Sequence, residues 1–209
     1  MSFAAMLSEA KLSETLPKLI LASSSPQRRR LLTEAGYRFE VVVPAEHAED
    51  GPDVGERPVD YAARMAYQKA ADVAPRVPSG VVIACDTIVE CGGEILGKPA
   101  DVADARRMLS ALSGQVHHVY SGLCVWPLPD GQAVVRTAET RLLMNRLSQE
   151  VLDEYLASGC WAGKAGAFGY QDRTGWLQVV EGSESNVIGL PMELLGEMLA
   201  QFGLPPRSV

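Results

Sequence analysis

The sequence predicts an α/β fold in which a mixed, twisted sheet is flanked by helices. Short apolar runs typical of strands alternate with segments whose apolar residues recur at helical spacing. Two longer strand-like runs follow each other across a turn, which indicates an antiparallel hairpin within this alternation. The composition, 47% hydrophobic and 22% charged, is typical of a globular domain. It excludes a disordered or fibrous chain.

The strands are predicted from apolar or alternating runs bounded by turn residues. The run 81–85 is continuously apolar, as expected of a central strand covered on both faces, and it is expected to end at Asp86. The run 88–96 turns at its pair of glycines into a short hairpin. The runs 116–126 and 133–143 flank a turn rich in proline, aspartate and glycine, and predict a long hairpin. In chain order, the predicted strands cover residues 19–22, 37–43, 81–85, 88–96, 116–126, 133–143 and 176–180.

The helices are predicted from apolar stripes and from capping residues. Ser25 and Pro26 suit the N-cap and the first position of the first helix. Asp101 and Ser148 are the expected N-caps of two later helices. In chain order, the predicted helices cover residues 26–35, 58–74, 101–112, 148–157 and 190–202.

A single domain over residues 19–205 is expected, preceded by a short extension over residues 1–18. The 209 residues contain no internal repeat and no linker that would separate two independent domains. The extension lacks the basic and apolar regions of a signal peptide. No apolar run approaches the ~20 residues that span a bilayer. We therefore expect a cytoplasmic protein that does not engage a membrane.

Charge and cysteine usage narrow the function classes. The chain has 26 acidic and 19 basic residues, a net charge of -7, which argues against a nucleic-acid-binding surface. Any phosphate binding must therefore be local. The four cysteines form no C-x-x-C pair, so they predict neither a zinc site nor a disulfide framework, and we expect reduced core residues.

Three features indicate such a local phosphate site. Ser23, Ser25 and Arg28 offer hydroxyls, backbone N–H groups and a guanidinium at a strand-to-helix turn. The alternative there is an ordinary capped helix with a solvated basic face. Lys69 falls on the apolar stripe of its helix, where it either snorkels to the rim or holds a phosphate. Lys98, in the tripeptide Gly-Lys-Pro, adds a second ammonium.

Carboxylate and amide groups complete the candidate site. Asp86 follows the central apolar run, at a place where ligands of open α/β sheets bind. It could hold a divalent metal or orient a water, or simply cap the turn. Glu49 and its neighbours add carboxylates from an acidic loop, although such loops are usually solvated surface. Gln171 ends a glycine-rich segment and offers both a donor and an acceptor. Jointly these groups point to a nucleoside polyphosphate as ligand.

The order of the motifs resembles the Maf family of nucleotide pyrophosphatases from about residue 19 to residue 202. In chain order the motifs are SSSPQRRRLL, QKA, ACDTIV, GKP, LSGQVHHVYSG, GKAGAFGYQ and GS-x-x-NVIGLP. The resemblance implies two lobes around a central cleft, an architecture also similar to inosine triphosphate pyrophosphatases. It further implies hydrolysis of nucleoside triphosphates to the monophosphate and diphosphate, with Mg²⁺ or Mn²⁺ as the cofactor.

The same resemblance assigns roles to individual residues. Asp86 matches the catalytic acid of the family and a metal ligand, with Glu49 as the best match for the second carboxylate. Arg28, Thr87 and Gln171 match the positions that set base preference. Asp-Thr at 86–87 resembles the dTTP/UTP branch, whereas the 7-methyl-GTP branch has Asp-Gln. The residues matching the phosphate pocket are Ser23, Ser25, Arg28, Lys69 and Lys98.

The predicted function is therefore hydrolysis of dTTP and UTP, including modified pyrimidine nucleotides. Two alternatives stay open: a 7-methyl-GTP pyrophosphatase of the same family, and a regulator of cell division that binds nucleotides without turnover. The chain departs from the family at Gln27, where the family usually has arginine, and in the irregular acidic loop. The expected partner is a small nucleotide, and a homodimer is an open alternative for assembly.

Overall fold

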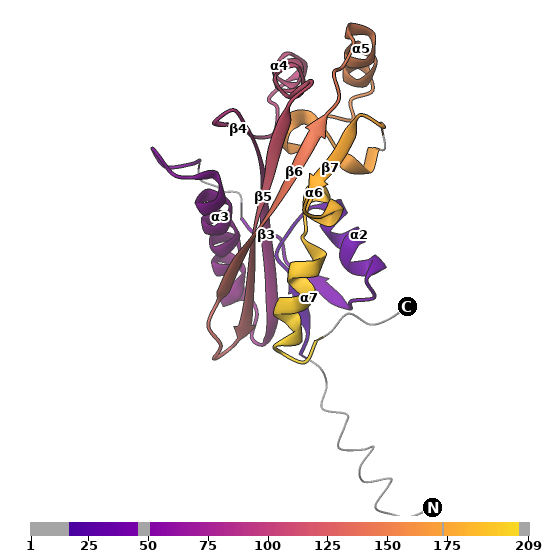
Figure 1. Cartoon of the computed structure of the whole chain (residues 1–209). Helices are drawn as coiled ribbons and strands as arrows, with labels where there is room; N and C mark the ends of the chain where they lie inside the picture. The colour runs from indigo at the N-terminus through magenta and orange to yellow at the C-terminus, as the bar shows by residue number, and fades with distance from the viewer. Residues whose placement is uncertain (1–16, 46–50, 173, 205–209) are drawn as a thin grey trace, which may run out of the picture.

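The computed structural model describes residues 17–45, 51–172 and 174–204. They form a mixed seven-stranded sheet flanked by helices, which confirms the predicted fold class (Figure 1). The strands are β1 (Leu19–Leu21), β2 (Phe39–Val41), β3 (Gly80–Cys91), β4 (Glu94–Leu96), β5 (Val116–Leu128), β6 (Val134–Met144) and β7 (Leu177–Glu181). The helices are α2 (Pro26–Glu34), α3 (Pro58–Val73), α4 (Val102–Leu112), α5 (Gln149–Ala157), α6 (Glu184–Ile188) and α7 (Met192–Ala200), with 3₁₀ turns at Ala74–Arg76, Ala165–Ala167 and Tyr170–Asp172.

The sheet changes from parallel to antiparallel pairing at its centre. Its strand order is β2-β1-β3-β5-β6-β7, and β4 pairs with the end of β3. The short strand β1 runs parallel to both β2 and β3. All other pairs are antiparallel, including the long predicted hairpin of β5 and β6. The three long strands β3, β5 and β6 therefore form the framework on which the shorter elements lie.

The prediction that the central strand ends at Asp86 is wrong. Strand β3 continues to Cys91 because β5 pairs with it over almost its whole length, from Gly80 to Glu90. Its parallel neighbour β1 does end early, at Leu21. Asp86 thus lies in the middle of a strand, just beyond the end of the adjacent one.

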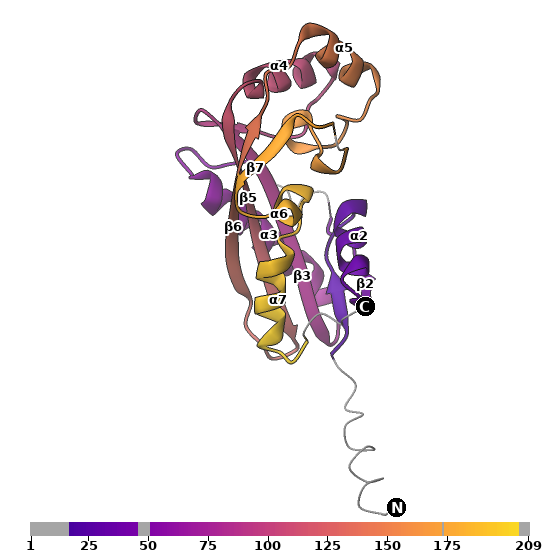
Figure 2. The ribbon, with the colours of Figure 1, turned by 45° about the vertical axis from the view of Figure 1, so that its right-hand side comes forward.

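Two cores cover the two faces of the sheet at one end of the molecule, and a third lies at the other end. Helix α3 packs on one face, while α2 and α7 pack on the opposite face (Figure 1). The third core is formed by α4 and α5 with the far ends of the long strands. Figure 2 shows these two ends of the molecule as separate lobes joined by the long strands.

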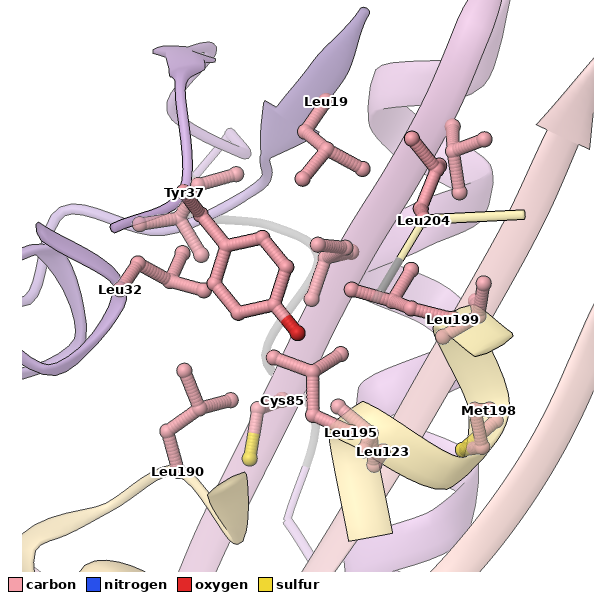
Figure 3. Close-up of a cluster of buried hydrophobic side chains, with 14 residues drawn as sticks. Leu19, Leu32, Tyr37, Cys85, Leu123, Leu190, Leu195, Met198, Leu199 and Leu204 are labelled. Carbon is pink, nitrogen blue, oxygen red and sulfur yellow. The ribbon is translucent and has the colours of Figure 1, made fainter. Parts of the chain in front are cut away.

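The core beneath α7 contains one of the four cysteines. Figure 3 shows Cys85 among Leu190, Leu195 and other apolar side chains. All four cysteines are free, and Cys85 and Cys124 are buried, as predicted. Burial raises the pKa of both thiols, that of Cys124 to about 12, so they stay protonated. Cys160, however, is exposed, so the prediction of a core residue is wrong there, and Cys91 is only partly buried, packed against the core of α4 and α5.

Local capping signals are confirmed, and a short helix precedes the last predicted one. The side chains of Ser25, Asp101 and Ser148 each accept a backbone N–H at the start of α2, α4 and α5. The helix predicted over 190–202 forms as α7, and it is preceded by the short helix α6, which the sequence did not predict. Gly189 between the two has a φ of 126°, which favours glycine. This break directs the Gly189 carbonyl toward α2 and β3.

The predictions about the domain boundaries and about membrane-spanning helices concern residues of which the structure describes only a part. Residues 1–16 and 205 lie outside the described residues, so the boundaries of the extension and of the domain stay predictions. In the part of the chain that the structure describes, no helix has both the length and the apolar character to cross a bilayer.

Candidate active site

A cleft of about 830 Å³ lies beside β3, beyond the point where β1 ends. Its walls come from the β1–α2 turn, α3, β3, the loop before α4, the segment 162–171 and the end of α6. The described residues that the sequence predicts for the site all line it: Ser23, Ser25, Arg28, Lys69, Asp86, Thr87, Lys98 and Gln171. Glu49, the predicted second metal ligand, lies outside the described residues.

Strand β3 presents Asp86 and Thr87 on opposite faces of the sheet, because successive side chains of a strand alternate. Val82 and Ala84 share the face of Asp86 and pack against α3. Cys85 shares the face of Thr87 and packs in the core beneath α7. Two consecutive residues of β3 therefore line the cleft from opposite faces of the sheet.

On the α3 face, Asp86 is paired with Lys69. Lys69 Nζ donates to Asp86 Oδ1 over 2.6 Å, and the two side chains are 8% and 15% exposed. Snorkelling of Lys69 to the rim, the alternative reading of the sequence, is excluded by this burial. Gly122 lies directly opposite Asp86 on β5, and a Cβ there would overlap the backbone of Ala62 in α3. The glycine thus permits the close packing of α3 on the sheet.

On the opposite face, Arg28 binds three different elements. Its Nε donates to the Gly189 carbonyl over 2.8 Å, its Nη1 to Ser23 Oγ over 3.2 Å, and its Nη2 to Thr87 Oγ1 over 3.5 Å. Ser25 caps α2 by accepting the backbone N–H of Arg28. The start of α2, with its positive dipole end, therefore lies against the cleft as an anion site requires.

The hydrogen bonds of the Thr87 hydroxyl are made with groups of the protein itself. It lies 2.8 Å from the hydroxyl of the buried Ser121 and 3.3 Å from the Gly189 carbonyl. Since the carbonyl can only accept, Thr87 donates to it and accepts from Ser121 and Arg28. One donor and two acceptor positions of the hydroxyl are thereby occupied. Thr87 fixes the Arg28 guanidinium and the break before α7.

The remaining wall is the glycine-rich segment, and an ion pair holds it. Lys164 Nζ lies 2.7 Å from each carboxylate oxygen of Asp172, and the Tyr155 hydroxyl donates to Asp172 Oδ2 over 2.8 Å. Burial and the neighbouring carboxylate keep the pKa of Tyr155 well above its usual value, so the phenol remains a donor. Because Tyr155 belongs to α5, this network connects the glycine-rich segment to the lobe that contains α4 and α5.

Some of these groups are absent from the predicted site. Lys164 lies within the quoted glycine-rich motif, and Asp172 follows Gln171 directly, so two opposite charges in one glycine-rich segment could have signalled their pairing. Ser121 and the Gly189 carbonyl carry no such signal, since their roles depend on strand pairing and on a helix break.

The donor set of the cleft fits a divalent cation that binds together with a triphosphate. Among the described residues, no group of three or more His, Cys, Asp or Glu side chains could hold a metal ion. Asp86 nevertheless supplies a carboxylate to the cleft wall. Mg²⁺ in nucleotide enzymes usually takes one or two protein carboxylates and completes its coordination with substrate phosphates and water. Asp86 meets that requirement.

Comparison with known proteins gives consistent matches along the chain. The model of the Maf-like protein family matches residues 18–202. A dTTP/UTP pyrophosphatase of Rhodopirellula baltica is 50% identical over 185 residues, which cover 88% of this chain and 82% of that protein. The dTTP/UTP pyrophosphatases of Sphingopyxis alaskensis and Geotalea uraniireducens are 44% and 42% identical, over 91% and 88% of this chain and 99% and 95% of theirs. With the motif order, these matches establish that the chain belongs to the Maf family.

Proposed function

We propose that this protein hydrolyses dTTP and UTP to the nucleoside monophosphate and diphosphate. The observation that carries the proposal is the pair of the buried Lys69 with the partly buried Asp86, in the wall of a cleft that also contains Arg28 and Lys98. A carboxylate beside several cations suits the attack of water on a polyphosphate. The pyrimidine preference is supported by the names of the relatives, which are dTTP/UTP pyrophosphatases.

In the proposed reaction, Asp86 accepts a proton from the water that attacks the α-phosphorus. Lys69 fixes the orientation of the carboxylate through the contact with Oδ1 and brings a positive charge to the reacting end of the substrate. Arg28 and Lys98 neutralise the phosphate oxygens and the charge that develops on the departing diphosphate. Ser23, whose oxygen accepts from Arg28 and from the backbone of Ser25, retains its own proton for a phosphate oxygen.

Asp86, with Glu49 as a second ligand, would hold Mg²⁺ or Mn²⁺. When bound, the cation supplies additional positive charge to the phosphates and lowers the pKa of a coordinated water. The metal requirement is tested by chelation with EDTA, which should abolish diphosphate release, and by addition of Mg²⁺ or Mn²⁺, which should restore it.

Gln171 is the proposed direct reader of the base. Its amide can donate to a carbonyl of uracil or thymine and accept from the ring N–H. Thr87 acts on base preference through Arg28, since its hydroxyl is already used within the protein.

The deciding experiment is a substrate panel that measures the nucleoside monophosphate and diphosphate formed from dTTP, UTP, CTP, ATP, GTP and 7-methyl-GTP. We expect dTTP and UTP to give the highest kcat/KM. In Gln171→Ala, the ratio of kcat/KM between UTP and GTP should fall, whereas the concentration of Mg²⁺ that gives half-maximal rate should stay unchanged.

Other outcomes of the panel have specific meanings. A preference for 7-methyl-GTP would overturn the base assignment and retain the chemistry. Nucleotide binding without any turnover would favour the regulatory alternative. A cytoplasmic location and a homodimer stay predictions, and the second can be tested by sedimentation of the purified chain.

A further inference from the structure

Lys164 places an ammonium in the wall of the cleft beside the proposed base reader. Its side chain is 18% exposed and lines the cleft together with Gln171. The two contacts with Asp172 use two of its three N–H bonds. The third N–H bond has no partner among the described residues and is available to a ligand in the cleft.

The amide of Gln171 and the ammonium of Lys164 converge over Gly169. A Cβ built on Gly169 would lie 2.7 Å from Gln171 Nε2, 2.8 Å from Lys164 Nζ and 2.9 Å from Asp172 Oδ2. The absence of a side chain at this position therefore allows the three polar groups to gather at one place. A single base edge can meet the amide and the ammonium together.

An amide alone cannot distinguish uracil or thymine from cytosine. It carries one acceptor and one donor group, and rotation by half a turn exchanges them. Thymine and uracil have an acceptor at position 4, whereas cytosine has an amino donor there. Gln171 can match either base by turning its amide. The proposed preference thus needs a group that can only donate.

Among the described residues, four side chains that line the cleft can only donate: Arg28, Lys69, Lys98 and Lys164. Lys69 is paired with Asp86, and Lys98 is assigned to the phosphates in the proposed function. Three N–H bonds of Arg28 are already directed to Gly189, Ser23 and Thr87. Arg28 also lies in the first turn of α2, the helix whose N-terminus suits the phosphates. Lys164 comes from the same segment as Gln171, and its charge is balanced by Asp172. That balance favours a directed hydrogen bond over a general attraction for phosphate.

We propose that Lys164 selects uracil and thymine over cytosine by donating a hydrogen bond to the carbonyl oxygen at position 4 of the base. Asp172 and Tyr155 are positioning residues in this arrangement, because they fix the ammonium and do not themselves face the base. The inference rests on the proposed function, since it names the group that gives this site its choice between two pyrimidines.

The test compares Lys164→Met with the matched control Lys98→Met, using kcat/KM for UTP and CTP. Lys164→Met should lower kcat/KM for UTP by about ten- to a hundredfold and leave that for CTP within about threefold, so the UTP/CTP ratio collapses. Lys98→Met should lower both values together, because this lysine serves the phosphates. Equal losses on UTP and CTP in Lys164→Met would assign Lys164 to the phosphates and overturn the proposal, as would unchanged kcat/KM for both substrates.

A substrate analogue provides a second measurement that needs no variant. In 4-thio-UTP the oxygen at position 4 is replaced by sulfur, a weak acceptor, while the ring N–H is kept. The wild-type protein should hydrolyse it about tenfold less efficiently than UTP, and Lys164→Met should not discriminate between the two. Equal kcat/KM for UTP and 4-thio-UTP in the wild type would also overturn the proposal. If the wild type hydrolysed neither dTTP nor UTP, the proposed function itself would fail.

Discussion

The two walls of the cleft are built in different ways. The first wall comes from α3, β3 and the β1–α2 turn, where backbone hydrogen bonds of regular elements hold Lys69, Asp86 and Arg28 in place. The second wall is the segment 162–172, which contains two short 3₁₀ turns and is held by the network of Lys164, Asp172 and Tyr155. Three groups proposed for the chemistry, Lys69, Asp86 and Arg28, thus lie on helices and strands. Gln171 and Lys164, the groups proposed to contact the base, lie on a segment that depends on side-chain contacts.

Asp86→Asn should have the largest effect on catalysis, and it should change only the chemistry of the first wall. The substitution keeps the size of the side chain but removes the charge and the proton acceptor, so kcat for UTP should fall on the order of a thousandfold. The temperature of unfolding should change little, because the amide oxygen can still accept from Lys69. Diphosphate release and differential scanning calorimetry measure the two quantities. A variant with wild-type kcat would remove Asp86 from the catalytic role.

Gly169→Ala should displace the polar groups of the second wall and leave those of the first wall in place. The new methyl group would force Gln171, Lys164 and Asp172 apart, since each has an atom within 3 Å of its position. A displacement of about 1 Å in a positioned group costs on the order of a hundredfold, and we expect that loss in kcat/KM for UTP. Gly163→Ala is the control for a general disturbance of the same segment, because its added carbon meets no atom within 4 Å, while its positive φ, which Gly169 lacks, makes its backbone strain the larger of the two. Equal losses in the two variants would attribute the effect to a general disturbance of the segment and not to the displaced polar groups.

Substitutions of two lysines of the cleft should separate the contribution of an ion pair to stability from the contribution of positive charge to catalysis. Lys69→Ala and Lys98→Ala should each lower kcat/KM by about tenfold or more, because both ammonium groups serve the phosphates. Only Lys69→Ala should also lower the temperature of unfolding, since it leaves the nearly buried Asp86 carboxylate without its partner, whereas Lys98 is exposed. Thermal unfolding of the two variants under identical conditions measures this difference. Equal unfolding temperatures would mean that the Lys69–Asp86 pair adds nothing to stability.

A further expected effect concerns the stability of the protein in acid, through a residue that packs beneath the second wall. His117 is fully buried beneath it, and its ring meets the edge of Phe168. Burial lowers the pKa of His117 to about 4, so between this value and the ordinary 6.5 the unfolded chain binds more protons than the folded one. The free energy of unfolding should therefore fall as the pH drops from about 6.5 to about 4, by up to about 3 kcal/mol.

The comparison for this effect is His117→Leu. Urea unfolding at several pH values should show a weaker dependence on pH in this variant than in the wild type over the same range. A parallel dependence in both proteins would assign the acid sensitivity to other groups.

The predictions from sequence succeeded where the signal was local. The caps at Asp101 and Ser148 depend on residues three positions apart, and the fold class depends on patterns within single elements. The continuation of β3 through Asp86 depends on pairing with β5, more than thirty residues away, which no local pattern reveals. Likewise, the motifs gathered Lys69, Asp86 and Thr87 into one site, but only the paired strands show which face each occupies.

The alternation of side chains along β3 has a consequence for redesign of the protein. Asp86 and Thr87 are covalent neighbours, yet they contact different helices across the thickness of the sheet. Substitutions at Thr87 and at its cross-strand partner Ser121 therefore perturb the side facing Arg28 and Gly189, and leave the packing of α3 intact. A library confined to these two positions and Gln171 would explore new nucleobases while leaving the Lys69–Asp86 pair on the opposite face in place.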